Sequence, residues 1–255
     1  MSSSKLIQLD KTYKWFVSPL AILLLWELSV YFNLVSEVFF PAPSEVILRI
    51  KFLITKDFGF LLHILDSLKR LAIGSLLAIP LAILLAISVE FNRVLAFIAR
   101  PVIAIIYPLP KLAIFPLLII ILGSGELAQI GIIFIGVFFL QFIETNQGVR
   151  DLIKTDYLDV ARVYRLSFWD RYFHVIFRGT LNHTLTGLKL GLGYGLVMVV
   201  AGEFAFSQKG LGFFMWNAWD QFRVIDLYCG LFIFAIMGIF IFYLVDKIRD
   251  NLPSV

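Results

Sequence analysis

Apolar runs of 17 to 22 residues recur along this 255-residue chain, and they constrain its fold more than any other feature. A helix of about 20 apolar residues crosses the hydrocarbon core of a bilayer. The chain is 60% hydrophobic and only 16% charged, whereas soluble domains are about 25% charged. The sequence therefore predicts an all-α, polytopic membrane protein.

Six segments have the length and composition of transmembrane helices: 15–32, 71–89, 101–122, 127–143, 181–201 and 227–245. Thirteen of the 22 Lys and Arg residues fall in the N-terminal segment, after the second and fourth spans, and in the C-terminal tail, against five in the other connections. Because cytoplasmic loops carry the excess of positive charge, we expect both termini in the cytoplasm. The net charge of +4 reflects this asymmetry rather than affinity for nucleic acid. We expect one transmembrane domain over 1–255.

The connection after the first span contains "FFPAPSEVILRIKFLI" (39–54). Ser44, which follows Pro43, is a candidate helix N-cap. Apolar residues then recur at helical spacing, with Arg49 and Lys51 at polar positions. This pattern predicts a short amphipathic helix in the membrane interface. The alternative is an ordinary structured loop.

The third predicted span is interrupted by Pro101, Pro108, Pro110 and Pro116. Interior prolines remove backbone donors and kink helices, and in a membrane such breaks persist only where protein or water satisfies the backbone. Lys111 would lie near the middle of the membrane if this segment were one helix. It is therefore a candidate for lining a substrate pathway, and the alternative is a structural cation that binds carbonyls freed at the breaks.

The fifth predicted span carries glycine at every fourth position, at Gly187, Gly191 and Gly195. Such a face lets another helix approach closely. Two roles are open for it: packing within the same chain, or lining a dimer seam or pathway. Lys189 is a further pathway candidate, although its position near the cytoplasmic end also allows it to extend toward water.

The remaining ionisable candidates for the pathway lie at the edges of spans: Glu126 in the turn "LGSGE" and Glu203 near the outer end of the fifth span. A secondary transporter or channel for small anions stays an alternative function. An ion-driven transporter is expected to place coupling acids near the midplane in two related halves, and no internal repeat is visible. An embedded enzyme would need clustered His, Asp, Glu or Cys side chains, and the sequence shows no such cluster.

Motifs for nucleotide, metal or nucleophilic chemistry are absent from the sequence. It contains no G-x-x-x-x-G-K-[ST] phosphate loop and no G-x-S-x-G nucleophile turn. The three histidines and Cys229 lack the spacing of metal ligands. We therefore expect no catalytic residue, no metal site and no cofactor on this chain, and no enzymatic activity.

A charged insert, "DYLDVARVYRLSFWDRYF" (156–173), separates the fourth and fifth spans. An apolar or small face at helical spacing is formed by Tyr157, Leu158, Ala161, Tyr164 and Leu166, and a polar face by Asp159, Arg162 and Arg165. Ser167 and Asp170 approximate a capping box for a second helix, with Asp in place of Glu. The insert is therefore predicted to be a helix–turn–helix whose apolar stripe docks in a partner's groove. The alternative is an amphipathic segment on the inner leaflet.

The insert and the glycine-rich span together resemble the "EAA" loop of ABC importer permeases. Asp159, Val160 and Ala161 stand at the first three positions of that pattern, Arg165 at its glycine, and Phe177 and Arg178 at its Leu-Pro. The family's Thr-Gly-Leu-Lys is matched at 186–189, and further matches are "FFPAPSEV", "LPKLAIFPLLI", "LGSGE", "VAGEF" and "KGLGFF". These resemble the branch that transports sulfonates, taurine, nitrate and bicarbonate.

The resemblance implies a type I ABC importer-like permease in the bacterial inner membrane, with a cytoplasmic coupling loop at 150–178. It implies two separate ATPase chains that bind ATP, a second permease copy that completes a homodimeric pore, an outer substrate-binding protein, and a small oxyanion as substrate. Within the loop, Ala161 is expected to pack against the ATPase groove. The residues implied in ATPase coupling are Asp159, Val160, Ala161, Arg162, Arg165, Leu166, Phe168 and Trp169.

Overall fold

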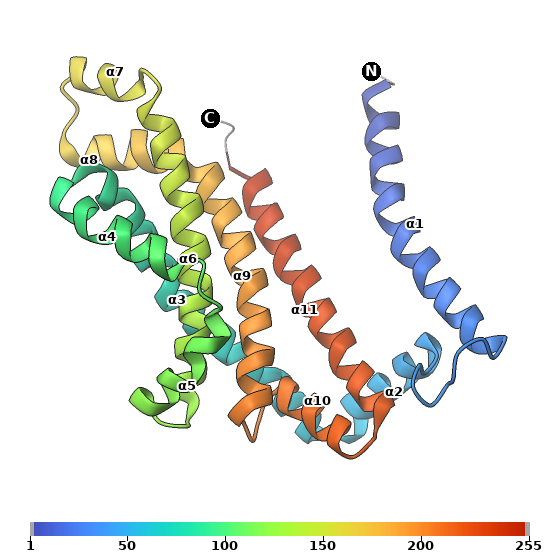
Figure 1. The fold of residues 1–255 in the computed structure, drawn as a ribbon. Coiled ribbons are helices and arrows are strands. Elements are labelled where there is room, and N and C mark those ends of the chain that lie inside the picture. Colours follow the sequence, from blue (N-terminus) through green and yellow to red (C-terminus); the bar gives the residue numbers. More distant parts are fainter. Residues whose placement is uncertain (1–2, 253–255) are drawn as a thin grey trace. The chain divides into compact units, whose positions relative to one another are not determined.

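The computed structural model describes residues 3–252, with side chains for 17–167 and 169–252. The described chain is helical and contains no β-strand, which confirms the predicted all-α class (Figure 1). Its elements are α1 (Ser3–Tyr31), α2 (Pro43–Lys56), α3 (Phe58–Phe91), α4 (Arg93–Ile106), α5 (Lys111–Leu122), α6 (Glu126–Ile153), α7 (Tyr157–Val163), α8 (Phe168–Asp170), the π-helix η1 (Arg171–Phe177), α9 (Arg178–Phe206), α10 (Leu211–Asp220) and α11 (Val224–Asp250).

Among the described residues, four helical segments are long and apolar enough to cross a membrane, namely α3, α6, η1 with α9, and α11, and the bent pair α4–α5 would make a fifth if it were one span. Each of the four segments contains one predicted span, so four of the six predictions match the structure. The described apolar part of the first helix, Val17–Tyr31, is shorter than these four. The total of six spans remains a prediction.

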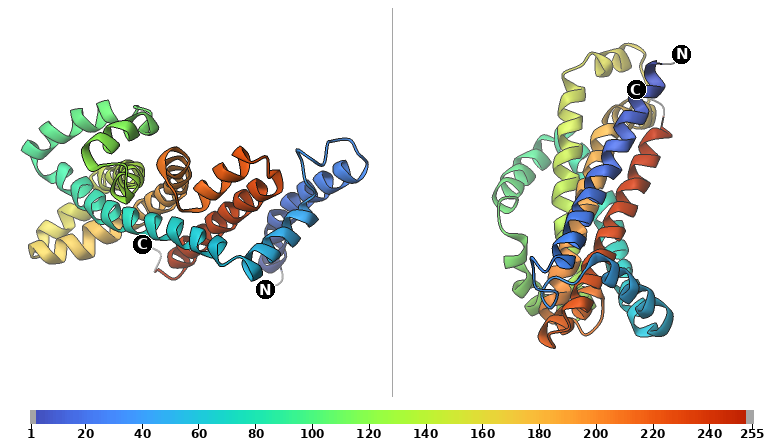
Figure 2. Two further views of the ribbon diagram at one scale, coloured as in Figure 1. Left: turned by 90° about the horizontal axis from the view of Figure 1, so that it is seen from below. Right: turned by 90° about the vertical axis from the view of Figure 1, so that its right-hand side faces the viewer.

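The segment predicted as the third span is not one helix. α4 and α5 are bent by 108° relative to each other, and the right view of Figure 2 shows the turn between them. Pro108 and Pro110 lie in the break, where proline removes an N–H donor and disfavours helix at the residue before it. The predicted interruption is confirmed. The depth expected for Lys111 applied only to a continuous helix, and the bend removes that condition.

The chain divides into two compact units, residues 1–61 with 214–232 and residues 62–213 with 233–255. The boundaries fall inside α3, α10 and α11, so these helices contribute to both units. The expectation of a single domain stays a prediction. Each unit has its own internal contacts and is described separately.

In the first unit, polar contacts fix α2. Arg49 Nε donates a hydrogen bond to Asp226 Oδ1 at 2.7 Å, and this bond raises the pKa of Arg49 above its ordinary value. The predicted helix at 43–54 is confirmed, but its N-cap is Ala42, and Ser44 is not the cap. Pro43 takes the first helical position, where its missing N–H is not needed, and the Ser44 hydroxyl instead donates to Glu27 at 2.6 Å.

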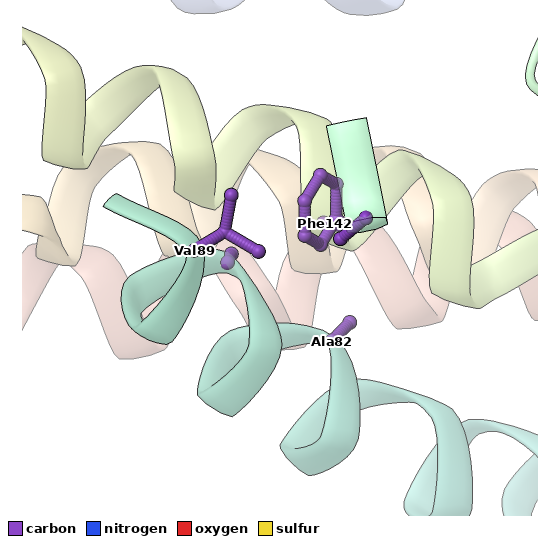
Figure 3. Close-up of a cluster of buried hydrophobic side chains, with 5 residues drawn as sticks. Ala82, Val89 and Phe142 are labelled. Carbon is purple, nitrogen blue, oxygen red and sulfur yellow. The ribbon is translucent and has the colours of Figure 1, made fainter. Parts of the chain in front are cut away.

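In the second unit, α3, α4 and α6 enclose an apolar core. Phe142 of α6 reaches toward α3 between Ala82 and Val89 (Figure 3). The small side chains of α3 leave space for this aromatic ring, which is only 4% exposed. Close packing of this kind gives the second unit a rigid framework from which the connections project.

Candidate functional site

The connection between α6 and α9 begins with the seven-residue helix α7 (Figure 1). This helix ends in a left-handed turn, in which the Leu166 N–H donates to the Ala161 carbonyl at 3.1 Å. Arg165 has φ of 51°, a conformation that non-glycine residues adopt at a cost of about 1–2 kcal/mol. The family pattern has glycine at this position. In this chain Arg165 replaces the glycine, but the left-handed turn that glycine favours is still formed.

The second half of the connection starts as predicted. Ser167 Oγ donates to Asp170 Oδ2 at 2.6 Å, and the Asp170 N–H donates to Ser167 Oγ at 3.1 Å. This pair is the expected capping box with Asp in place of Glu. The helix that follows has only three α-helical residues and then continues as the π-helix η1. Arg178, at the position of proline in the family, begins α9 without a break.

One face of α7 is anchored inside the unit. Leu158 packs into an apolar cluster with Ile87 of α3, Val149 and Leu152 of α6, and Ile176 of η1. Ala161, one turn further along the same face, is only 3% exposed. Ala161 also lines a hollow together with Tyr157, Val160 and Tyr164. Its packing against a partner groove stays a prediction.

The opposite side of the connection carries apolar side chains into solvent. We call this surface the coupling face; it consists of Tyr157, Val160, Val163 and Tyr164, all of them exposed. Trp169 of α8, in the second half of the connection, is also exposed. Val163 and Tyr164 are 80% and 76% exposed. An apolar surface in a connection that otherwise carries charge indicates a contact with another molecule.

Charged residues border the coupling face. Arg162 and Asp159 form an exposed ion pair with an N–O distance of 2.8 Å. Arg165 and Leu166 are also exposed. The side chain of Phe168 lies outside the described residues. Among the predicted coupling residues, Val160, Ala161 and Leu166 line one hollow, which Tyr157 and Tyr164 also line.

The apolar stripe predicted for the first helix includes Tyr164 but not Val163, and neither residue was among those expected in ATPase coupling. The signal was present in the apolar spacing of Val160, Val163 and Tyr164, which are three and four positions apart and so lie on one side of a helix. The Glu-Ala-Ala pattern of the family instead predicted a partner contact at Ala161. The pattern therefore located the helix, and the spacing of its apolar residues locates the exposed side.

Lys111 stands at the break between α4 and α5. Its ammonium group donates to the carbonyl of Tyr107 and lies 4.6 Å from the centre of the Tyr107 ring and 5.7 Å from that of Phe139. Its contacts match the structural alternative, in which the cation satisfies a carbonyl freed by the proline break. A role in the pathway remains a proposal.

The glycine face of α9 packs within the chain. A Cβ atom on Gly187 would meet Gln141 and Glu144 of α6 at 3.0 Å, and one on Gly191 would lie 3.3 Å from Val137. A Cβ atom on Gly195 would approach Leu71 of α3 to 2.8 Å. In this structure the three glycines therefore serve close packing of α9 against its neighbours. Figure 1 shows α6 and α9 side by side.

Lys189 joins α9 to α11. Its Nζ atom lies 2.7 Å from Asp246 Oδ2 and 5.3 Å from the centre of the Phe242 ring. The carboxylate of Asp246 pairs with the positive charge of Lys189, and the Phe242 ring contacts it, both within the second unit. The position of Lys189 in the pathway also remains a proposal.

Glu203 belongs to a buried cluster of charges. Its side chain is 1% exposed and forms an ion pair with Arg70, which is 3% exposed, at 2.7 Å. Ser67 Oγ donates to the same carboxylate at 2.8 Å, and the Gly212 N–H donates at 2.7 Å. The cluster therefore ties α3, α9 and the start of α10 together.

Glu126 lies at the edge of this cluster, 3.6 Å from Arg70 and 3.4 Å from Lys69. Arg70 and Ser67 had not been identified as site residues. Their spacing of three positions on α3 places them on one face of the helix. The sequence gave no sign that this face meets Glu203, which lies more than 130 positions away along the chain.

Comparison with known proteins assigns the segment that contains these features to one protein family. The family described as the binding-protein-dependent transport system inner membrane component matches residues 78–253. The match includes the coupling face, the glycine face and Glu203. It begins within α3 and extends past the end of α11.

Curated relatives match over most of the chain. A Bacillus subtilis protein with the provisional name aliphatic sulfonates transport permease protein SsuC is 29% identical over 89% of this chain and 83% of its own length. The nitrate import permease protein NrtB of Leptolyngbya laminosa is 31% identical over 76% of this chain and 70% of its own length. The taurine transport system permease protein TauC of Escherichia coli is 28% identical over 87% of this chain and 82% of its own length.

Proposed function

Because the chain belongs to the family of binding-protein-dependent transport system inner membrane components, we propose that it couples import to ATP hydrolysis through the α7–α8 connection. The chain is the permease subunit of an ABC transport system, and its family transports solutes rather than transforming them. Its relatives place it in the branch for sulfonates, nitrate and taurine.

The coupling face is the observation that carries this proposal. Its apolar side chains are exposed outside the membrane-crossing segments, whereas Leu158 on the other side of α7 is held in the core. A separate ATPase chain that covers the face would bury these side chains and gain hydrophobic stabilisation.

The connection is built to pass a displacement on to the membrane. α7 is held by contacts with α3, α6 and η1, and η1 continues into α9 without an intervening loop. When ATP binding moves the ATPases, the connection would move as a rigid body and carry the attached ends of α6 and α9 with it. This movement would switch the pathway between a state open to the outside and a state open to the cytoplasm.

The assembly that we propose contains two ATPase chains, a second permease chain identical to this one, and an outer binding protein. ATP is bound on the ATPase chains, and this chain needs no cofactor of its own. The protein lies in the bacterial inner membrane with both termini and the coupling face in the cytoplasm, as the distribution of positive charge predicts.

The proposed substrate is a small oxyanion. Aliphatic sulfonates and nitrate, for which relatives are named, share this chemistry. We propose that Lys111 is the cation that attracts the substrate into the pathway. Glu126, Lys189 and Glu203 are further ionisable residues that we propose along the pathway. A smaller uptake of the anion by Lys111→Met, at unchanged expression, would support this assignment.

The coupling proposal is tested by Val163→Asp, which puts a carboxylate in the middle of the coupling face. We expect at least a tenfold loss of ATPase co-purification, because a desolvated and unpaired charge costs more than the 1.4 kcal/mol that a factor of ten represents. The amount of permease in the membrane should be unchanged, because Val163 is 80% exposed and contributes little to packing within the chain.

The matched control is Lys154→Asp, which introduces the same carboxylate into the same connection outside the coupling face. Lys154 is 72% exposed, and its pair with Asp151 lies on the surface, so its loss should change little. Equal ATPase co-purification and equal uptake by the wild type and Val163→Asp would contradict the proposal.

A further inference from the structure

A hollow lies beside the side of α7 that carries Leu158 and Arg162. We call it the arginine pocket; it has a volume of about 420 Å³ and lies among the end of α3, α7 and η1. None of its nine lining residues is acidic, and two are arginines. The lining consists of Ile87, Ser88, Phe91, Asn92, Leu158, Arg162, Arg171, Tyr172 and Ile176.

Both guanidinium groups are available for an anion. Arg171 has no side-chain hydrogen bond or ion pair with any residue that the structure describes. Arg162 pairs with Asp159, but the two side chains are 69% and 72% exposed, and a surface pair of this kind contributes little to stability. An anion in the pocket can therefore recruit Arg162 without breaking a costly contact.

Polar groups around the arginines suit a phosphate. Ser88 and Tyr172 line the pocket with hydroxyl groups. Arginine binds phosphate oxygens in a bidentate geometry, with shorter and stronger hydrogen bonds than neutral donors make. Two arginines and two hydroxyls are therefore a fitting set of donors for a phosphate group.

Apolar surface continues from the pocket along the chain. Phe91 in the lining is 50% exposed, and Val94 and Phe97 on the adjoining α4 are 71% and 81% exposed. Phe91 is the last residue of α3, a helix that is long and apolar enough to cross the membrane. The pocket thus lies where a membrane-crossing helix ends, and apolar surface that needs covering lies next to it.

We propose that the arginine pocket binds the headgroup of an anionic membrane phospholipid. Arg162 and Arg171 contact the phosphate, Ser88 and Tyr172 donate further hydrogen bonds, and the acyl chains cover Phe91 and the exposed side of α4. A free phosphate would gain nothing from the apolar surface, whereas a lipid gains from both parts. Basic pockets between membrane helices on the cytoplasmic side recognise such headgroups.

A bound lipid would touch both arms of the connection, α7 through Arg162 and η1 through Arg171, as well as the end of α3. It would therefore hold the connection against the helix that leaves the membrane. The placement at the inner leaflet rests on the proposed orientation, but lipid binding itself is measured on this chain alone, without an ATPase.

The test compares lipid binding to the full-length protein purified in neutral detergent, by native mass spectrometry with phosphatidylglycerol and with phosphatidylcholine. We expect the wild type to prefer phosphatidylglycerol, and Arg171→Gln to weaken its binding about fivefold, as for one cation near an anionic headgroup. Arg171→Lys should keep most of the preference, because it keeps the charge. Lys154→Gln, which removes an exposed cation outside the pocket, should bind like the wild type.

Four results would overturn the proposal. One is equal binding of the two lipids, and another is an equal loss in Arg171→Gln and Lys154→Gln. The third is displacement of phosphatidylglycerol by inorganic phosphate at the same concentration, which would assign the pocket to a soluble anion. If Arg171→Gln kept its lipid binding but lost ATPase co-purification, the arginine would contact protein, and the lipid proposal would also fail while the coupling proposal stood.

Discussion

The buried cluster at Glu203 and the coupling face reverse the usual distribution of side chains. At Glu203, two charged side chains that are 1% and 3% exposed lie inside the helix packing. On the coupling face, Val163 and Tyr164 are exposed in a connection outside the membrane-crossing segments. The charges are satisfied within the chain, whereas the apolar side chains are not covered by it. The difference separates a structural contact from a surface that needs a partner.

The energetic reason for this separation lies in desolvation. A buried carboxylate is tolerated only with partners for its charge and its lone pairs, and Glu203 receives hydrogen bonds from Arg70, Ser67 and the Gly212 backbone. An exposed apolar side chain has no comparable requirement for a particular partner. It gains only when another surface excludes water from it. Changes in the two regions should therefore affect different measurements.

The largest expected effect is a loss of folding stability in the variant Arg70→Met. Removal of this cation leaves the Glu203 carboxylate buried without its charge partner, which is expected to cost about 3–5 kcal/mol of stability. The apparent melting temperature of the purified protein in detergent measures the loss. Lys69→Met is the control, because the neighbouring Lys69 is 57% exposed and pairs with Glu126 at 3.4 Å, a contact worth about 0–1 kcal/mol.

A second change sharpens this result. Adding Glu203→Gln to Arg70→Met removes the stranded charge and should restore part of the lost stability, so the two effects will not add. Equal melting temperatures for Arg70→Met and Lys69→Met would show that the buried pair does not have the structural role assigned to it.

The next effect is at the anchor of the coupling face. Leu158→Ala removes the buried side chain that holds α7 to the core, and truncations of this kind cost about 2–5 kcal/mol. We expect the loss to appear as faster hydrogen exchange of the α7 amides and lower ATPase co-purification. Val160→Ala, on the exposed side of α7, should leave the exchange rates unchanged, and equal exchange in both variants would contradict the anchoring.

The smallest effect is at the turn that ends α7. Arg165→Gly relieves the left-handed conformation and should stabilise the turn by about 1 kcal/mol. Arg162→Gly, within the helix, should destabilise it by a similar amount. Hydrogen exchange of the Leu166 amide, which is bonded to Ala161, reports both changes, and a shift in the same direction for both variants would rule out this explanation of the turn.

Local patterns predicted local structure well. The length of the apolar runs located four membrane-crossing helices, and Ser167 with Asp170 predicted the start of α8 through side-chain and backbone bonding within four residues. The prolines around Lys111 predicted a break, because proline affects the backbone where it stands. In these places the physical cause lies within a few residues of the effect.

Features that depend on distant partners could not be predicted in this way. Leu158 is anchored because α3, α6 and η1 together form an apolar cluster around it, and helical spacing does not say which of two faces is anchored. The partner of Glu203 is Arg70, on a helix three spans earlier in the predicted order. The 108° angle between α4 and α5 and the π-helical geometry of η1 likewise depend on tertiary packing rather than on local residue preferences.

Site-specific photocrosslinking from position 164 tests the central claim most directly. A photoreactive residue in place of Tyr164, which is 76% exposed on the coupling face, should crosslink in native membranes to an ATP-hydrolysing chain. The same residue in place of Lys154 should give little of this product. Crosslinks from position 164 to lipid alone, with no ATPase chain attached, would contradict the claim that the coupling face is the contact through which ATP hydrolysis drives transport.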